Sequence, residues 1–82
     1  MPLREELAAL EHDRWARWMK HLFGQSSLQP DGSVLIPPVR VERWQRQVQT
    51  PYAELSEAEK DSDRREADRT LAVLAKHTPL PG

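Results

Sequence analysis

Charged side chains interrupt the apolar face of the first predicted helix, residues 3–23. The leucines of this segment recur at the spacing of one helical face. The same face then passes Glu11, Arg14 and Trp15 before it reaches Trp18. Because an unpaired buried charge is costly, these groups should meet opposite charges or a ligand.

The last predicted helix, residues 57–76, shows the same anomaly. Its expected buried stripe consists of Ala67, Leu71 and Leu74. Projected backward along the helix, the stripe reaches Asp63 or Arg64 and then Lys60. Both long helices therefore place charge on a side that should be apolar.

Two interpretations of these charges stay open. The first is a purely structural ion pair between the helices, either Arg14–Asp63 or Glu11–Arg64. The second is a polar pocket in which Trp15 and an arginine hold a planar, charged ligand. Both interpretations can be true at once if one ion pair is structural and the neighbouring groups contact the ligand.

Six side chains should converge if the two long helices pack by their apolar faces. These candidate ligand-binding residues are Glu11, Trp15, Trp18, Tyr52, Lys60 and Arg64. Their rings suit a base, the carboxylate suits an amino or hydroxyl group, and the two cations suit phosphate. If they do not bind, the expected alternatives are the seam of a dimer or the Arg40–Arg46 face of the middle helix.

Local signals predict the elements that position these groups. The expected helices span residues 3–23, 39–49 and 57–76, with a minor β-hairpin near 26–36 that should lie on the helices. Pro38 suits a first helical position, and Thr50 before Pro51 should end the middle helix. Ser56 and Glu59 form a capping box for the last helix. The fold class is therefore mainly α, a small three-helix domain with a hairpin.

Composition limits the chain to one thin domain. It has 82 residues, of which 38% are hydrophobic, and a net charge of −1. A single domain over 1–82 is expected, with a core from about 3 to 76 and a frayed tail at 77–82. Because so small a core is marginal, a homodimer is expected.

Composition also disfavours several classes of protein. The chain has no cysteine, which excludes disulfides, thiolate zinc sites and a cysteine nucleophile. The three histidines lack metal-ligand spacing, and no catalytic residue, metal site or cofactor is expected. A pI near 6.3 argues against a general nucleic-acid binder. With no membrane-length apolar run and no signal-peptide core at the start, a cytoplasmic protein is expected.

Two blocks of sequence resemble the ryanodine-receptor repeat domain. Leu7–Trp15 is similar to its opening helix, with the Glu-His-x-x-Trp pattern at Glu11, His12 and Trp15. Pro51–Arg64 is similar to its closing segment, with an aromatic residue, a Leu-Ser cap and an acidic stretch. The resemblance covers roughly residues 6–74 and points to a stand-alone prokaryotic or phage version.

The resemblance implies a mainly helical fold with short strands, paired copies and a cleft for an adenine-type nucleotide. It also makes Trp15 the natural stacking residue and connects the chain with nucleotide signalling and anti-phage defence. The chain departs from the family between Gly24 and Ser27 and in an extra helix that carries Trp44. Ligand contacts from the family's loop cannot be carried over there.

Three functions are weighed on these grounds. The first is binding of a nucleotide-derived small molecule, as a sensor or as a phage sponge that sequesters an immune signal. The second is a helical adaptor that binds protein through Trp18 or Trp44 as anchors. The third, an enzyme acting on nucleotides, lacks a metal or nucleophile constellation, so the chain is expected not to be an enzyme.

Overall fold

The computed structural model describes residues 2–77 of the chain. Helix α1 spans Leu3–Gly24, strands β1 and β2 span Ser27–Leu28 and Val34–Leu35, and helix α2 spans Pro38–Gln49. A 3-10 turn, η1, covers Tyr52–Glu54, and helix α3 spans Glu57–His77. The prediction of a mainly helical fold with three helices and a minor hairpin is therefore confirmed. The tail expected at 77–82 lies, from residue 78 on, outside the described residues.

The predicted local signals end and begin the helices as expected. Pro38 occupies the start of α2, and α2 ends where Thr50, before Pro51, has extended backbone angles. At the start of α3 the Ser56 hydroxyl accepts a hydrogen bond from the Glu59 amide at 3.2 Å. The Glu59 carboxylate in turn accepts from the Ser56 amide at 3.3 Å. This reciprocal pair is the predicted capping box.

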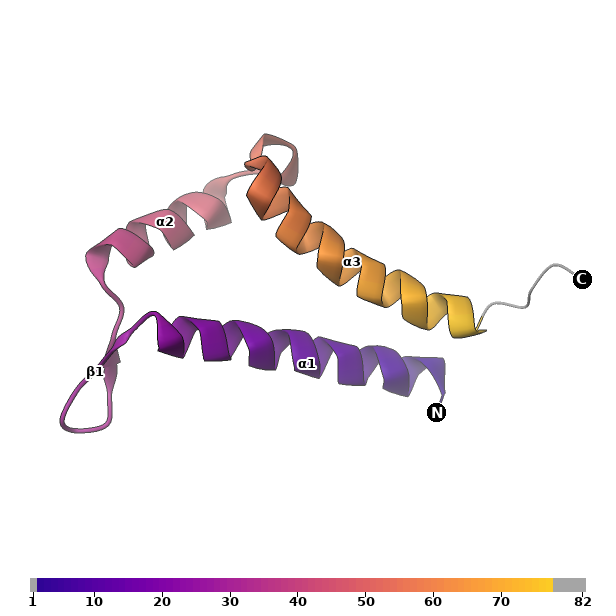
Figure 1. The fold of residues 1–82 in the computed structure, drawn as a ribbon, viewed down its shortest axis with the longest axis horizontal. Coiled ribbons are helices and arrows are strands. Elements are labelled where there is room, and N and C mark those ends of the chain that lie inside the picture. The colour runs from indigo at the N-terminus through magenta and orange to yellow at the C-terminus, as the bar shows by residue number, and fades with distance from the viewer. Residues whose placement is uncertain (1, 78–82) are drawn as a thin grey trace, which may run out of the picture.

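The two long helices run antiparallel, side by side, and α2 bridges the opening between them (Figure 1). Glu66 of α3 holds Arg17 of α1, with Oε2 2.7 Å from the arginine Nη2. Near the other end of α1, Glu6 Oε1 lies 3.2 Å from His77 Nε2. These contacts fix the register of α1 against α3.

The β-hairpin projects from the junction of α1 and α2 (Figure 1). Its strands pair antiparallel, with Leu28 opposite Val34. Gly32 closes the turn at φ +90°, in the region that favours glycine. Leu28 is 76% exposed, so the expectation that the hairpin lies on the helices is wrong for the single chain.

Residues 2–77 of the single chain form no buried core. No side chain among residues 2–77 is buried, although Leu3, Leu7 and Leu10 are half-buried on the side of α1 expected from the sequence. The radius of gyration is 17.0 Å, against about 12 Å for a compact chain of this length. The thin core predicted from composition is therefore absent from the described part of the isolated chain.

The buried stripe predicted for α3 is also wrong. Leu71 is 60% exposed, and the side of α3 turned toward α1 carries Glu66, with Thr70 and Val73 half-buried. Apolar spacing identified the most apolar side of α3, whereas the pairs between Glu66 and the arginines of α1 turn a different side inward.

The helices within residues 2–77 include none with both the length and the apolar character that a transmembrane span requires.

Candidate functional site

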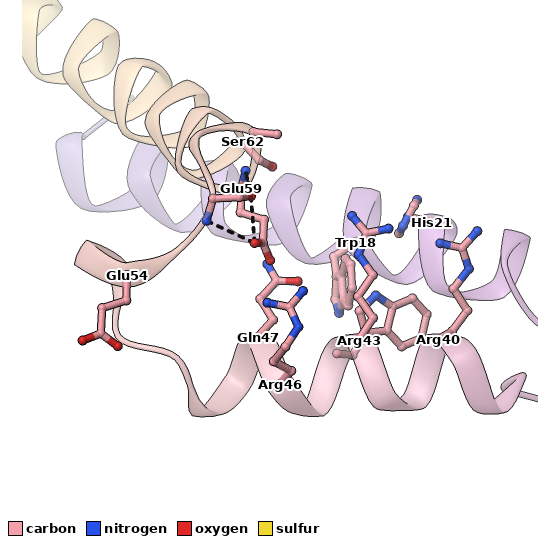
Figure 2. Close-up of a pocket in the computed structure, with 12 residues that line it drawn as sticks. Trp18, His21, Arg40, Arg43, Arg46, Gln47, Glu54, Glu59 and Ser62 are labelled. Carbon is pink, nitrogen blue, oxygen red and sulfur yellow. Dashed lines mark hydrogen bonds between the residues drawn. The ribbon is translucent and has the colours of Figure 1, made fainter.

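A cleft of about 640 Å³ lies between the C-terminal half of α1, helix α2 and the start of α3. Figure 2 shows it from the side, with α2 along one wall. We call it the α2 cleft. Its lining comprises Trp18, His21, Arg40, Arg43, Trp44, Arg46, Gln47, Glu54, Ser56, Ala58, Glu59 and Ser62. Its volume lies within the range of small-molecule sites, about 300–1,000 Å³.

Three arginines of α2 give the cleft its positive charge. Arg40, Arg43 and Arg46 follow one another at intervals of three residues, so they emerge from one side of the helix. Figure 2 shows them extending from α2 along the cleft, while Glu54 points away from them. Among residues 2–77 none of the three forms an ion pair or a side-chain hydrogen bond. They remain available to an anion.

Aromatic rings form the wall beside the arginines. The rings of Trp18 and Trp44 meet edge to face, with centroids 5.3 Å apart and planes inclined by 70°. The imidazole of His21 lies 5.4 Å from the Trp18 ring and 6.3 Å from the Trp44 ring. This contact joins α1 to α2 and places ring surface next to the cations.

Glu59 contributes a carboxylate to the opposite wall. The hydroxyl and amide of Ser56 donate to Glu59 Oε1. Those bonds lower the pKa of the Glu59 carboxyl, and the charges of Arg46 and Arg43 lower it further. The second oxygen, Oε2, is shielded from solvent and has no hydrogen-bond partner in the described part of the chain. An ionised acceptor therefore faces the basic side of α2 across the cleft.

The six predicted binding residues do not converge on one cavity in the single chain. Trp18 lines the α2 cleft, but none of the other five does. Glu11 pairs with Arg14 of its own helix at 3.2 Å. Trp15 is 59% exposed and has the ring of His12 beside it, with centroids 6.0 Å apart.

Three of the six, Tyr52, Lys60 and Arg64, lie together at the start of α3. Lys60 Nζ is 5.8 Å from the centre of the Tyr52 ring. Arg64 is held by its own helix, at 2.8 Å from Asp61 and 3.0 Å from Glu57. Those hydrogen bonds raise the pKa of the Arg64 guanidinium further above its ordinary value. Arg64 is therefore already engaged and less available to a ligand than the arginines of α2.

The two ion pairs expected between the long helices are also wrong in their partners. Arg14 pairs with Glu66 at 3.4 Å instead of with Asp63, and Arg64 pairs within α3 instead of with Glu11. The interhelical pair itself exists. Its partner lies about one turn further along α3, because the apolar faces of two helices do not determine their axial register.

The sequence indicated the main residues of the cleft only as secondary candidates. From the sequence, the Arg40–Arg46 face is only the alternative site, Trp44 is only a possible anchor of an adaptor, and Glu59 is only part of the cap. The usable signal was three arginines at three-residue spacing on the helix that carries Trp44. The contact between Trp18 and Trp44 needed the tertiary structure.

The described residues contain no cluster of three or more histidine, aspartate or glutamate side chains placed to hold a metal ion. No protein-family model matches the chain, and no match was found among curated proteins or solved structures. The α2 cleft, with its unpaired arginines and aromatic rings, is therefore the main structural guide to function.

Proposed function

We propose that this chain binds a nucleotide-type small molecule, with a planar ring and phosphate groups, in the α2 cleft. The observation that carries the proposal is the set of three unpaired arginines, Arg40, Arg43 and Arg46, beside the Trp18–Trp44 pair. The proposed role is binding as a sensor, or as a sponge for a signalling nucleotide, in the cytoplasm. The resemblance to ryanodine-receptor repeats supports the same class of ligand.

Each wall of the cleft suits one part of such a ligand. Arginine guanidinium groups bind phosphate through paired, charge-assisted hydrogen bonds. The Trp18 and His21 rings offer stacking surface to a base, which contributes about 1–3 kcal/mol per base. The amide of Gln47 can hydrogen-bond to amino or hydroxyl groups of the ligand.

Calorimetric titration with a panel of ATP, ADP-ribose and cyclic oligonucleotides tests the proposal. Inorganic phosphate and adenosine separate the contribution of the charge from that of the ring. Replacing one arginine that contacts phosphate costs on the order of 1.4 kcal/mol or more, which is about tenfold in affinity. We therefore expect Arg43→Gln to weaken the tightest ligand of the panel at least about tenfold.

The matched control is Arg65→Gln, which removes the same charge from an exposed site on α3. We expect it to leave the affinity within about twofold of wild type, since only long-range screened electrostatics change. Equal losses in both variants would show that net charge alone drives binding, and would contradict the site. Failure of every nucleotide to bind at millimolar concentration would contradict the function.

The residues proposed from sequence provide a second comparison. If the pocket predicted on the long helices were the site, Lys60→Gln and Arg64→Gln would abolish binding. Because Arg64 is already held by Asp61 and Glu57, we expect both variants to bind like wild type.

The same titrations test the enzyme alternative. Loss of free nucleotide from the mixture of protein and nucleotides would indicate turnover instead of binding.

The adaptor function stays the second candidate because of a separate apolar groove. About 280 Å³ in volume, it is lined by Trp18, Trp44, Gln47 and Val48. Val48 is 86% exposed there, which is unusual for the apolar side of an amphipathic helix. If the nucleotides fail, this groove is where a protein partner would place an apolar anchor.

A further inference from the structure

One side of the layer formed by α1 and α3 carries exposed apolar side chains that nothing in the described chain covers. Arg14 of α1 and Glu66 of α3 face each other across the layer, 3.4 Å apart. Trp15 and Ala67 each follow one of these residues, so each is turned 100° onward around its helix. In an antiparallel pair of helices this rotation brings both to the same side. Leu71, four residues after Ala67, shares that side.

We call the surface formed by Trp15, Ala67 and Leu71 the outer face. Trp15 is 59% exposed and Leu71 is 60% exposed. A hollow of about 300 Å³ lies beside them, lined by Arg14, Asp63, Glu66 and Ala67. The outer face thus combines two large exposed apolar side chains with a depression of side-chain size, as expected for an interface.

The chain exposes more surface than a compact monomer of its size would. The chain exposes 6707 Å², whereas a compact monomer of its 9.5 kDa exposes about 5,000 Å². The excess is about 1,700 Å², and a standard interface removes only about 800 Å² from each partner. Even half of the excess would supply a standard interface, and all of it is typical of an obligate homodimer.

We propose that a second copy of this chain packs on the outer face, and that folding and pairing are one transition. Two of the charges at its edges permit this, because they are already paired within each chain, Glu11 with Arg14 and Arg64 with Glu57 and Asp61. Asp63 in the hollow forms no ion pair within residues 2–77, so it must stay at the solvent-exposed rim of the interface. With a net charge of only −1, two copies also repel each other weakly. A two-fold arrangement lets each copy present the same surface to the other. This pairing does not depend on the ligand cleft.

Sedimentation and thermal unfolding of the unliganded chain test the proposal. We expect a species of about twice 9.5 kDa at micromolar concentration, and an unfolding midpoint that rises with protein concentration. A helical monomer with the same midpoint from 1 to 100 micromolar, about a hundredfold range, would overturn it.

Two arginine substitutions, Leu71→Arg and Ala72→Arg, test which face pairs. They add the same charge at adjacent positions, but Ala72 is turned about 100° further round α3, away from the outer face. We expect Leu71→Arg to abolish the dimer and Ala72→Arg to keep it. A dimer that persists in Leu71→Arg, or is lost equally in both, would overturn this placement.

A milder variant guards against simple misfolding of Leu71→Arg. Leu71→Ala adds no charge, and we expect it to raise the dimer dissociation constant about tenfold or more. Its circular dichroism should return to that of wild type when the protein concentration is raised. Wild-type dimerisation of Leu71→Ala, or helix loss that concentration does not restore, would contradict pairing through this face.

Discussion

Replacing Glu66 by glutamine should loosen α1 from α3. Glu66 accepts two hydrogen bonds from Arg17, at 2.9 and 2.7 Å, and Arg14 Nε lies 3.4 Å from the same carboxylate. Glu66→Gln keeps the shape of the side chain and removes the charge that both arginines approach. Exposed ion pairs contribute about 0.2–1 kcal/mol. A carboxylate that accepts two hydrogen bonds from Nη2 of one arginine and lies near a second arginine belongs at the upper end. We expect a loss of about 1 kcal/mol of unfolding free energy.

Thermal unfolding at one fixed protein concentration measures this loss. For a chain of this size, 1 kcal/mol corresponds to a midpoint shift of about 4–8 °C. Glu42→Gln is the matched control, because Glu42 is exposed on α2 and forms no ion pair within residues 2–77. An unchanged midpoint in Glu66→Gln, or an equal fall in Glu42→Gln, would refute the view that Glu66 fixes this register.

The same contact predicts how stability depends on pH. The hydrogen bonds and charge of Arg17, followed by the charge of Arg69, lower the pKa of the Glu66 carboxyl below its ordinary value. The stabilisation is therefore complete above the pKa of the unfolded state and is lost as pH falls through the lower folded pKa. We expect wild type to lose more unfolding free energy than Glu66→Gln on acidification from pH 6 to about pH 3. Parallel curves would contradict the assignment.

The remaining predictions concern the local elements. Ser56→Ala removes the cap of α3 and should lower the unfolding free energy by about 1 kcal/mol in thermal unfolding; no change would mean that the cap is dispensable. Gly32→Ala should destabilise by about 1 kcal/mol because its φ is +90°. Gly24→Ala, at an open helical position with ordinary φ, should be neutral or stabilising, and equal effects of the two glycines would contradict the turn geometry.

The elements could be predicted because their signals are local. Pro38, Thr50 before Pro51 and the Ser56–Glu59 box act within a few residues of the helix ends that they define. The hairpin turn at Gly32 is local in the same sense. Each signal depends on backbone geometry that tertiary contacts leave unchanged.

The relation between the elements could not be predicted in the same way. Periodicity gave a face to each long helix, but the partner of Arg14 depends on axial register, and Glu66 lies one turn from the expected Asp63. The exposed Leu71 shows a second reason. An apolar stripe indicates that something covers it, but the sequence does not say whether the cover comes from the same chain.

One part of the candidate site could be predicted from the sequence, and another part could not. The Arg40–Arg46 face was recognisable from spacing and was retained as an alternative site. Trp15 and Trp18 share a helix and both were expected to line one pocket, yet only Trp18 meets Trp44 and the cleft. Which tryptophan faces α2 depends on how the chain returns after the hairpin, and no local pattern encodes that.

The indole N–H resonances of the three tryptophans test the central claim most directly. Each tryptophan gives one such signal in a ¹H–¹⁵N correlation spectrum, and Trp→Phe variants assign the three. On titration with ATP, the α2 cleft predicts that the Trp18 and Trp44 signals move together and saturate at one dissociation constant, while the Trp15 signal stays in place. If the Trp15 signal moves while the Trp18 and Trp44 signals stay in place, the result would contradict the account and place the ligand on the outer face.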